Sequence, residues 1–576
     1  MRKLAGAMRP SGPDCARAAC DVLLGLVAGK LRGVAELILG PMLRYVDERD
    51  ATVWVETDGP CDVEALGHRA HTFHVSGHHY ALVVLDGLEP GESREYAVAL
   101  DGERRWPDPG SSLPASRIRA LHPGRGMSVA FGSCRAAAPH ELPWVLERRE
   151  HRLGRGVDAL QALAHRTSKS PWQQWPSLLL MVGDQVYADD ASPQTREFIR
   201  SRRATGEPPG DGVADFEEYT RLYSEAWGEP TIRWILSAVP SAMIFDDHEV
   251  IDDWNTSAAW KRERRELRWW PDRIAGAFMS YWLYQHLGNL SPDELREDQL
   301  YERVRAADDG GPLLREFALN ADRTTSGSRW SYARKLGRSR LVVIDSRAGR
   351  LFKDGRREMV DDEEWRWLDG ELRGDADHLL IATSLPFLLP RAIHDLEAWD
   401  EALCDGAWGA TGVRFGERLR RAIDLEHWAS FRSSFHRLAR TLRAVAAGER
   451  GSAPASIILL SGDVHYAYLA EAGFLGEPVE SRIYQAVCSP FRHSLDSPME
   501  LANRFAFSAA AERVGTLLER SVRLPAAPIS WQTKQGPYFE NEVATLQLRG
   551  RQARLRLERT PRRELRLDCV LDTRLT

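Results

Sequence analysis

The sequence predicts an α/β core preceded by an all-β domain. Three observations support this fold class. Residues 37–105 consist of short alternating stretches separated by turn residues, residues 125–500 contain six short apolar runs separated by helix-like stretches, and residues 541–576 alternate again. Short apolar runs are typical of buried strands. Strands that alternate with helices predict a layered α/β domain.

Composition limits the function classes. The chain has 576 residues, which is too long for one ordinary domain, and its 43% hydrophobic and 28% charged residues are normal for a globular protein with a large core. Its 77 basic residues are balanced by 83 acidic ones, so the net charge of -6 lacks the basic footprint of a nucleic-acid-binding protein. The seven cysteines are scattered and odd in number, which argues against a disulfide framework and fits a reducing compartment.

Residues 1–36 are expected to form an N-terminal extension. A short basic start is followed by a semi-apolar stretch that Lys30, Arg32 and Glu36 interrupt. A signal peptide needs an uninterrupted apolar segment and a membrane span needs about 18 apolar residues or more, and neither pattern is met. The sequence therefore predicts a cytoplasmic protein without a transmembrane segment.

Residues 37–108 are predicted to form a β-sandwich domain. Stretches 51–57, 72–75 and 80–85 alternate in the manner of strands, and Asp-Gly and Pro-Gly turn signals separate them. Several short strands in such a segment are typical of immunoglobulin-like or fibronectin-like sandwiches. Residues 106–110, Trp-Pro-Asp-Pro-Gly, are expected to form the linker to a second domain over 125–576.

Each of the six apolar runs ends in residues that favour metals or phosphate. The runs are 127–131 before Gly-Ser-Cys-Arg, 178–182 before Gly-Asp-Gln-Val-Tyr, 242–245 before Asp-Asp-His-Glu, 341–344 before Asp-Ser-Arg, 379–382 before Thr-Ser, and 457–460 before Ser-Gly-Asp-Val-His. Ligands of layered α/β folds gather at the carboxyl ends of the strands. We therefore expect these six ends to form one site.

Helices and further strands complete the predicted core. The apolar spacing over 264–287 and 419–447 indicates helices. Residues 545–548, 553–557 and 565–567 alternate strictly, and we expect the segment 541–576 to add strands to a sheet of the core.

Two cations held close together can polarise a phosphoryl group, activate water and stabilise a leaving oxygen. Such a site needs a bridging carboxylate, and Asp184 is the natural candidate because Gly183 lets the backbone turn sharply after the strand. Asp463 and His465 are separated by one residue, so a turn of the backbone can direct both side chains to one side. These residue types predict metal ligands, although carboxylates that cap helices give the same pattern.

Cys134 and Tyr187 are less common ligands. A thiolate and a phenolate together favour a Lewis-acidic, redox-capable ion such as Fe³⁺ over Mg²⁺. Asp247 and His248 lie at a third predicted strand end. Each of these residues has an alternative reading as an ordinary core or half-buried side chain.

The ordered motifs, taken together, resemble the alkaline phosphatase D family of metallophosphoesterases, also called PhoD-like phosphatases. The resemblance covers about residues 40–570. It implies a four-layer α/β/β/α core, hydrolysis of phosphomonoesters or phosphodiesters by a metal-activated water at a multinuclear site, and an Fe³⁺ ion with Ca²⁺; Mn²⁺ or Zn²⁺ is the alternative. The missing twin-arginine signal departs from the exported members of that family.

The resemblance also assigns residues. It implies metal ligation by Cys134, Asp184, Tyr187, Asp247, Asp463 and His465. His248 would contact the phosphate or protonate the leaving group, and Arg135 and Arg347 would bind phosphate through their forked donors. Arg347 has the alternative of pairing with a nearby carboxylate. Residues 252–257 and the Trp- and Arg-rich run 260–270 fall outside the general pattern and are expected to form a lid.

Two further readings of the function remain open at this point. One is a phosphodiesterase that acts on lipid or teichoic-acid-like polymers. The other is a non-catalytic binding protein whose sandwich domain recognises a partner while the metal site is vestigial. The main prediction is an enzyme whose substrate is a small-molecule or polymeric phosphate ester, with no nucleic acid as partner.

Overall fold

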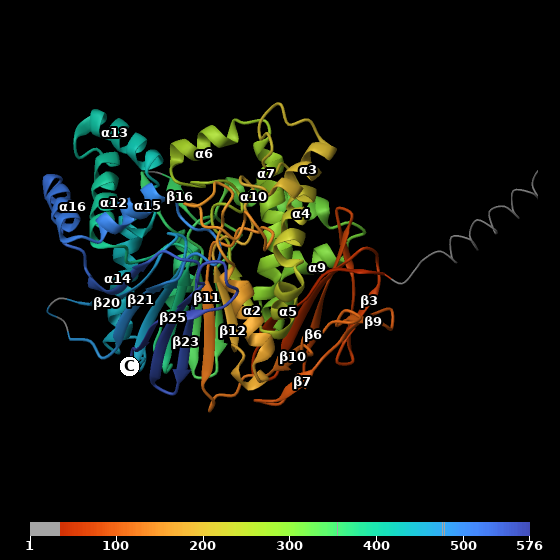
Figure 1. The fold of residues 1–576 in the computed structure, drawn as a ribbon. Helices are drawn as coiled ribbons and strands as arrows, with labels where there is room; N and C mark the ends of the chain where they lie inside the picture. Colours follow the sequence, from red (N-terminus) through yellow and green to blue (C-terminus); the bar gives the residue numbers. More distant parts are fainter. Residues whose placement is uncertain (1–34, 354, 475, 477) are drawn as a thin grey trace, which may run out of the picture.

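The computed structural model describes residues 35–353, 355–474, 476 and 478–576. The predicted extension over 1–36 therefore lies almost wholly outside the described residues. Figure 1 shows two large sheets at the centre of the molecule, the N-terminal strands on one side and a group of helices on the other. Among the described residues, no helix is long and apolar enough to cross a membrane.

The N-terminal strands form two antiparallel four-stranded sheets. The first has the order β1-β2-β6-β5 and contains β1 (Leu37–Val46), β2 (Ala51–Thr57), β6 (His78–Leu85) and β5 (Phe73–Val75). The second has the order β4-β3-β8-β9 and contains β4 (His68–His71), β3 (Asp62–Ala65), β8 (Val98–Leu100) and β9 (Glu103–Trp106). A separate ribbon joins β7 (Ser93–Glu95) to β10 (Arg117–Arg119). The all-β sandwich predicted from the alternating stretches is confirmed.

The first core sheet has the order β13-β12-β11-β23-β24-β25. Its strands are β11 (Met127–Gly132), β12 (Leu178–Val182), β13 (Ser241–Ile244), β23 (Glu542–Arg549), β24 (Gln552–Arg559) and β25 (Asp568–Arg574). The C-terminal strands thus extend this sheet, as predicted. The last strand begins at Asp568 and not at Leu565, because Arg566 turns back to donate its backbone N–H to the Glu564 carbonyl at 2.9 Å.

The second core sheet has the order β14-β15-β18-β19-β21-β20-β22. Its strands are β14 (Tyr332–Leu336), β15 (Ser339–Ile344), β18 (His378–Thr383), β19 (Ser456–Ser461), β20 (Ala467–Gly473), β21 (Arg482–Val487) and β22 (Ser530–Tyr538). β15, β18, β19 and β21 are parallel. All six apolar runs of the sequence are therefore strands, three in each sheet. A short hairpin joins β16 (Leu351–Lys353) and β17 (Arg356–Glu358).

Alternate residues of the second sheet face different layers, which produces the α/β/β/α arrangement. Leu341, Leu380 and Ile458 belong to the core shared with the first sheet. Val342 and Ile457 lie in a second core with the helices on the outer face. Those helices are α11 (Asp362–Glu371) and α14 (Arg432–Ala446).

The remaining helices surround the two sheets. They are α2 (Ala159–Lys169), α3 (Pro193–Arg202), α4 (Phe216–Trp227), α5 (Pro230–Ala238), α6 (Ala258–Arg265), α7 (Trp270–Ser280), α8 (Pro292–Glu297), α9 (Gln299–Ala306), α10 (Gly311–Arg323), α12 (Arg391–Cys404), α13 (Gly409–Ala422), α15 (Ser497–Ala506) and α16 (Ala509–Ser521). Short helical turns are η1 (Trp172–Gln174), η2 (Tyr281–His286), η3 (Leu287–Asn289) and η4 (Trp428–Ser430).

Both long predicted helices are interrupted. The expected helix over 264–287 is divided between α6, α7 and η2, and the expected helix over 419–447 is divided between α13 and α14. The second break has a clear cause, because Leu425, Glu426 and His427 turn inward and are buried. A continuous helix could not direct three successive side chains into the core.

Candidate active site

Hydrogen bonds join the ends of strands from both sheets. The backbone N–H of Asp463, after β19, donates to Ser133 Oγ, after β11, at 3.0 Å. The N–H of His248, after β13, donates to Asp184 Oδ1, after β12, at 3.2 Å. The N–H of Gly462 donates to the Ser384 carbonyl, after β18, at 2.9 Å. The structure thus brings the predicted strand ends together at one edge of the core.

Two glycines allow this close approach. A Cβ atom on Gly462 would lie 2.0 Å from Ser133 Oγ and 2.9 Å from the Val182 carbonyl oxygen. Gly183 has a φ of +139°, a conformation that side-chain-bearing residues rarely adopt, and a Cβ there would lie 3.2 Å from Asp246 Oδ2. Gly183 directly precedes Asp184 and Gly462 directly precedes Asp463, so each glycine determines the backbone path into a predicted ligand.

Three predicted ligands have a left-handed backbone. The φ angles are +53° at Cys134, +65° at Asp463 and +57° at His465. Such angles are uncommon for residues other than glycine and are found where surrounding structure holds a functional residue in place. The backbone therefore turns at both Asp463 and His465, as the prediction that they share a site requires.

Two groups of metal-liking side chains lie within the cluster. Asp184, Asp247 and His248 form one group, and Asp246, Asp247 and Asp463 form the other; within each, one ligand atom per residue lies within 4.8 Å of the others. Asp247 belongs to both groups. Asp246, which is not among the predicted ligands, belongs to the second.

Cys134 and Tyr187 lie beside these carboxylates. Burial, Asp184 and Asp463 raise the pKa of the Cys134 thiol well above its usual value, and the sulfur lies 3.6 Å from the Asp463 carbonyl oxygen. Burial, Asp184 and Cys134 likewise raise the pKa of Tyr187. The buried Tyr187 hydroxyl has no hydrogen-bond partner among the described residues, so it is available to a ligand that the protein itself does not supply.

His248 is held by Asp189, a residue that the sequence analysis missed. The Asp189 carboxylate lies 2.9 Å from His248 Nδ1. Burial lowers the pKa of His248, but Asp189 and Asp247 outweigh burial and raise this pKa well above its usual value. Asp189 and Asp247 therefore favour the protonated form of His248. The signal available in the sequence was an acidic residue two positions after Tyr187.

His427 holds Asp463 and was also missed. His427 Nε2 lies 3.1 Å from Asp463 Oδ2, and His427 Nδ1 lies 2.6 Å from Glu397 Oε1. The helical periodicity of residues 419–447 concealed this histidine. The signal available in the sequence was the run Asp-Leu-Glu-His at residues 424–427, which places charged residues beside the histidine.

His493 is the third missed residue. Its Nδ1 lies 3.1 Å from His465 Nδ1, and its ring stacks on Tyr187 with centroids 5.2 Å apart. Asn541, for which the sequence suggested a turn, accepts the His493 backbone N–H at 3.1 Å. Burial lowers the pKa of His465 to about 4 and that of His493 well below its usual value, so both rings are neutral and can donate a lone pair to a metal.

Arg347 lies at the centre of the carboxylates. It forms ion pairs with Asp246, with Asp247 at 3.2 Å, with Glu426 at 2.5 Å and with Asp463 at 3.1 Å. The side chain is fully buried. These contacts match the alternative interpretation of Arg347, in which it pairs with carboxylates. Its role in phosphate binding stays a prediction.

Arg135 is directed away from the cluster. Its guanidinium group pairs with Asp158 at 2.8 Å and donates to the Ala226 carbonyl. Asp158 in turn caps the N-terminus of α2 through the backbone N–H of Leu160 and Gln161. The backbone N–H of Arg135 donates to the Asp184 carbonyl at 3.2 Å, but the contacts of its side chain lie elsewhere and favour a structural role.

Residues 252–257, which were expected to belong to a lid, are packed against the site. The Asp253 N–H donates to Asp247 Oδ2 at 2.9 Å, and Asn255 Nδ2 donates to the Arg347 carbonyl at 3.1 Å. Trp254 is buried. This segment thus holds Asp247 and Arg347 in position.

The cluster contains more buried acid than buried base. Burial and mutual repulsion raise the pKa values of Asp184 and Asp246 well above the usual range, although His248 and Arg347 oppose the shift. Buried carboxylates are stable as anions only when they are paired or bind metal. Carboxylate, imidazole, thiol and unpartnered phenol groups in one place therefore fit a cation.

Comparisons with known proteins agree with this geometry. Residues 162–490 match the family model described as "PhoD-like phosphatase", and residues 34–118 match a domain of unknown function, DUF7800. The solved structure titled "Structure of PhoD" aligns with a TM-score of 0.56 at 12% identity, over 94% of this chain and 92% of that one. A maltogenic amylase from S. marinus aligns with a TM-score of 0.15, which is too low to indicate a shared fold. No curated protein matches the chain.

Proposed function

Because the chain belongs to the PhoD-like phosphatase family, it is a phosphoesterase, and we propose that it hydrolyses its substrate at the strand-end cluster around Asp184, Asp247 and Asp463. The observation that carries this proposal is the excess of buried carboxylates beside an unpartnered Tyr187 hydroxyl. A site that only stabilised the fold would pair these groups with one another.

We propose that two cations bind here. Cys134, Tyr187, Asp184, Asp463 and His465 would hold one, and Asp184 with Asp247 would hold the other. The thiol and the phenol favour Fe³⁺ for the first, with Ca²⁺ as the second, and Mn²⁺ or Zn²⁺ remains the alternative. When bound, such ions neutralise the phosphoryl oxygens and activate water.

The protein's own residues would position and protonate the substrate. His248 Nδ1 is fixed by Asp189, and Nε2, which lies 3.7 Å from the exposed Asp252 carboxylate, would donate a proton to the leaving oxygen. His427 and Arg347 both contact the Asp463 carboxylate and would keep it oriented. Arg155, which pairs with Asp190 at 2.5 Å and lines the same pocket as Tyr187, would be a better placed phosphate-binding arginine than Arg135.

The first experiment measures metal content. Protein purified without added metal is compared with Cys134→Ala and with Cys61→Ala, which removes another buried thiol from the N-terminal sandwich. We expect near-stoichiometric iron in the parent and in Cys61→Ala, and a large loss in Cys134→Ala. Iron that is unchanged by Cys134→Ala would refute the thiolate ligand.

The second experiment measures activity. A panel of phosphomonoesters and phosphodiesters, lipid and polymer substrates included, is tested with the metal-loaded parent and with Asp184→Asn. We expect hydrolysis by the parent and a loss of about 10³-fold or more in the variant, because Asp184 is common to both ion sites. A metal-loaded parent that is inert toward the whole panel would favour the binding-protein alternative instead.

A further inference from the structure

A large groove lies away from the candidate active site. It has a volume of about 970 Å³ and lies between the end of α2 with η1 on one side and the open face of β23, β24 and β25 on the other. Met127 and Ser128, at the start of β11, contribute to its lining. The lining also includes Thr545, which pairs with Ala130 of β11, and Cys134 comes four residues after Ala130, so about 13 Å of extended chain separates this part of the groove from the site.

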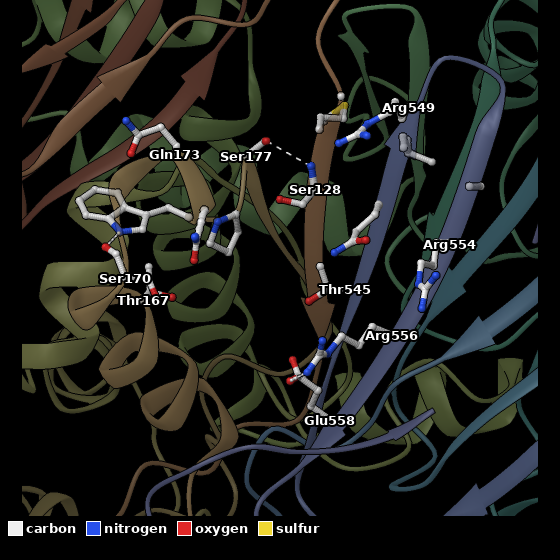
Figure 2. A pocket seen from close by; sticks show the side chains of 18 of the residues that line it. Ser128, Thr167, Ser170, Gln173, Ser177, Thr545, Arg549, Arg554, Arg556 and Glu558 are labelled. Atoms are coloured by element: carbon white, nitrogen blue, oxygen red, sulfur yellow. Dashed lines mark hydrogen bonds and ion pairs between the residues drawn. The ribbon is translucent and has the colours of Figure 1, made fainter. Parts of the chain in front are cut away.

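The strand side of the groove carries four arginines because of its register. In β23 and β24 the alternate residues that point outward are polar, and Gln547 pairs with Arg554, Thr545 with Arg556, and Arg549 with Gln552. Arg574 of β25 lies directly across from Arg554. Figure 2 shows Arg549, Arg554 and Arg556 along the strands, with Gln173, Ser170 and Thr167 on the opposite side.

The positive charge of the groove is only partly neutralised within the protein. Arg166, which comes from α2, makes the fifth arginine of the lining, and Glu558 is the acidic residue of that lining. Glu558 is shared between Arg166 at 2.6 Å and Arg556 at 3.0 Å, and Asp572 pairs with Arg554. Arg549 and Arg574 form no ion pair with the Asp and Glu side chains of the described residues, and Arg574 donates to the Thr576 main-chain oxygen. Five arginines and two carboxylates leave an excess of positive charge in the groove, with four of the arginines on the strand side and Arg166 on the side of α2.

This arrangement is costly unless an anion binds. Like charges directly across an antiparallel pair are destabilising, and Arg554 and Arg574 are such a pair. Arg556 Nε is in addition buried without a hydrogen-bond partner in the described structure. Forked guanidinium groups match the oxygens of phosphate, and the glutamines, serines and threonines of the lining add neutral donors.

We propose that this groove binds an anionic ligand that carries two or more phosphate groups, at a site separate from the candidate active site. One phosphate occupies one or two guanidinium forks. A row from Arg549 to Arg556, with Arg574 beside it and Arg166 opposite, therefore suits a chain of phosphates better than a single one. The inference does not depend on the proposed function, because it uses none of the strand-end residues.

The test titrates inorganic tripolyphosphate into the full-length protein as purified, followed by calorimetry. The parent is compared with Arg554→Gln/Arg574→Gln and with a matched control, Arg418→Gln/Arg513→Gln, which removes two exposed arginines from α13 and α16. All three proteins keep the same strand-end cluster, so binding or hydrolysis there is common to them. Release of orthophosphate is measured in parallel, and melting temperatures verify that each variant is folded.

We expect the groove variant to bind tripolyphosphate about tenfold more weakly or worse, and the control variant to bind like the parent. Orthophosphate should bind the parent much more weakly than tripolyphosphate does. Equal weakening in both variants would show non-specific attraction and overturn the site. Unchanged binding in the folded groove variant, or no binding in the parent, would overturn it as well.

Discussion

At the residue scale, the proton on His248 is controlled by Asp189, a residue outside the motif that contains the histidine. Asp189 lies 2.9 Å from Nδ1, and its own pKa falls to about 2, because the attraction of His248 outweighs burial. The pair therefore fixes both the ring orientation and the charge of the proposed acid. A general acid of this kind contributes about 10²- to 10⁴-fold to a rate.

Replacing Asp189 should weaken that acid. In Asp189→Asn the carboxylate that raises the pKa of His248 is lost, so this pKa falls and the ring loses its proton at lower pH. We expect kcat to fall about 10- to 100-fold and the alkaline limb of the pH–rate profile to move to lower pH. Steady-state kinetics across the pH range, with equal metal content in both proteins, measure the two effects.

The control for this change is Asp211→Asn, which breaks an exposed ion pair with Arg200. Its pH–rate profile should match that of the parent. If Asp189→Asn lowered kcat without moving the alkaline limb, Asp189 would act on the structure of the site and not on the proton of His248.

The ligands predicted from the sequence all lie within five residues of the end of a strand. Cys134, Asp184 and Asp463 each come directly after a short apolar run, and the rule that ligands gather at strand ends applies to them without knowledge of the fold. Asp189 and His493 lie farther along loops whose paths the sequence does not determine. Their roles depend on tertiary contacts, with His248 in one case and with His465 and Tyr187 in the other.

At the element scale, strands were predicted better than helices. Both faces of these strands are buried, so a short run of apolar residues is enough to identify each one as a strand. The stretch 419–447 has the apolar spacing of a helix, but the chain leaves α13 at Ile423 and resumes at α14. The loop between them carries Glu426 and His427 to Arg347 and Asp463. These contacts outweigh the local helical preference.

The approach of β19 to β11 should depend on Gly462. In Gly462→Ala the added Cβ would lie 2.0 Å from Ser133 Oγ, so one strand end must move. Overpacking of this kind costs about 1–3 kcal/mol. We expect a lower melting temperature and a marked loss of bound metal, because Asp463 follows Gly462 and Cys134 follows Ser133.

Gly473→Ala is the matched control, since a Cβ on Gly473 of β20 meets nothing within 4 Å. This variant should keep the melting temperature and the metal content of the parent. A Gly462→Ala protein that binds the parent's amount of metal would show that the strand ends tolerate separation.

At the scale of the whole molecule, buried polar contacts join the N-terminal sandwich to the core. Arg44 of β1 donates to the carbonyls of Tyr284 and Gln285 at 2.6 and 2.7 Å. His78 of β6 lies 2.8 Å from Glu56 and 2.9 Å from Glu217 of α4. The ion pair of His78 with Glu217 crosses between the two parts, so its charge links their association to pH.

His78 should stabilise the protein below neutral pH and lose this effect in alkali. Burial lowers its pKa, but the hydrogen bonds to Glu217 and Glu56 outweigh burial and raise the pKa from 6.5 to about 9. A pKa that is higher in the folded state contributes stability that is complete below about 6.5 and disappears as pH rises through about 9. After a discount for partial exposure, the contribution is about 1–2 kcal/mol.

Thermal unfolding of His78→Gln measures this contribution. The variant should melt below the parent at about pH 6, and the difference should shrink toward zero at about pH 10, because the parent has then lost the same charge. His71→Gln is the control, since His71 pairs with Asp62 in a largely exposed position and should cost little at either pH. A deficit in His78→Gln that stayed constant with pH would mean that the shape of the imidazole, and not its charge, joins the sandwich to α4.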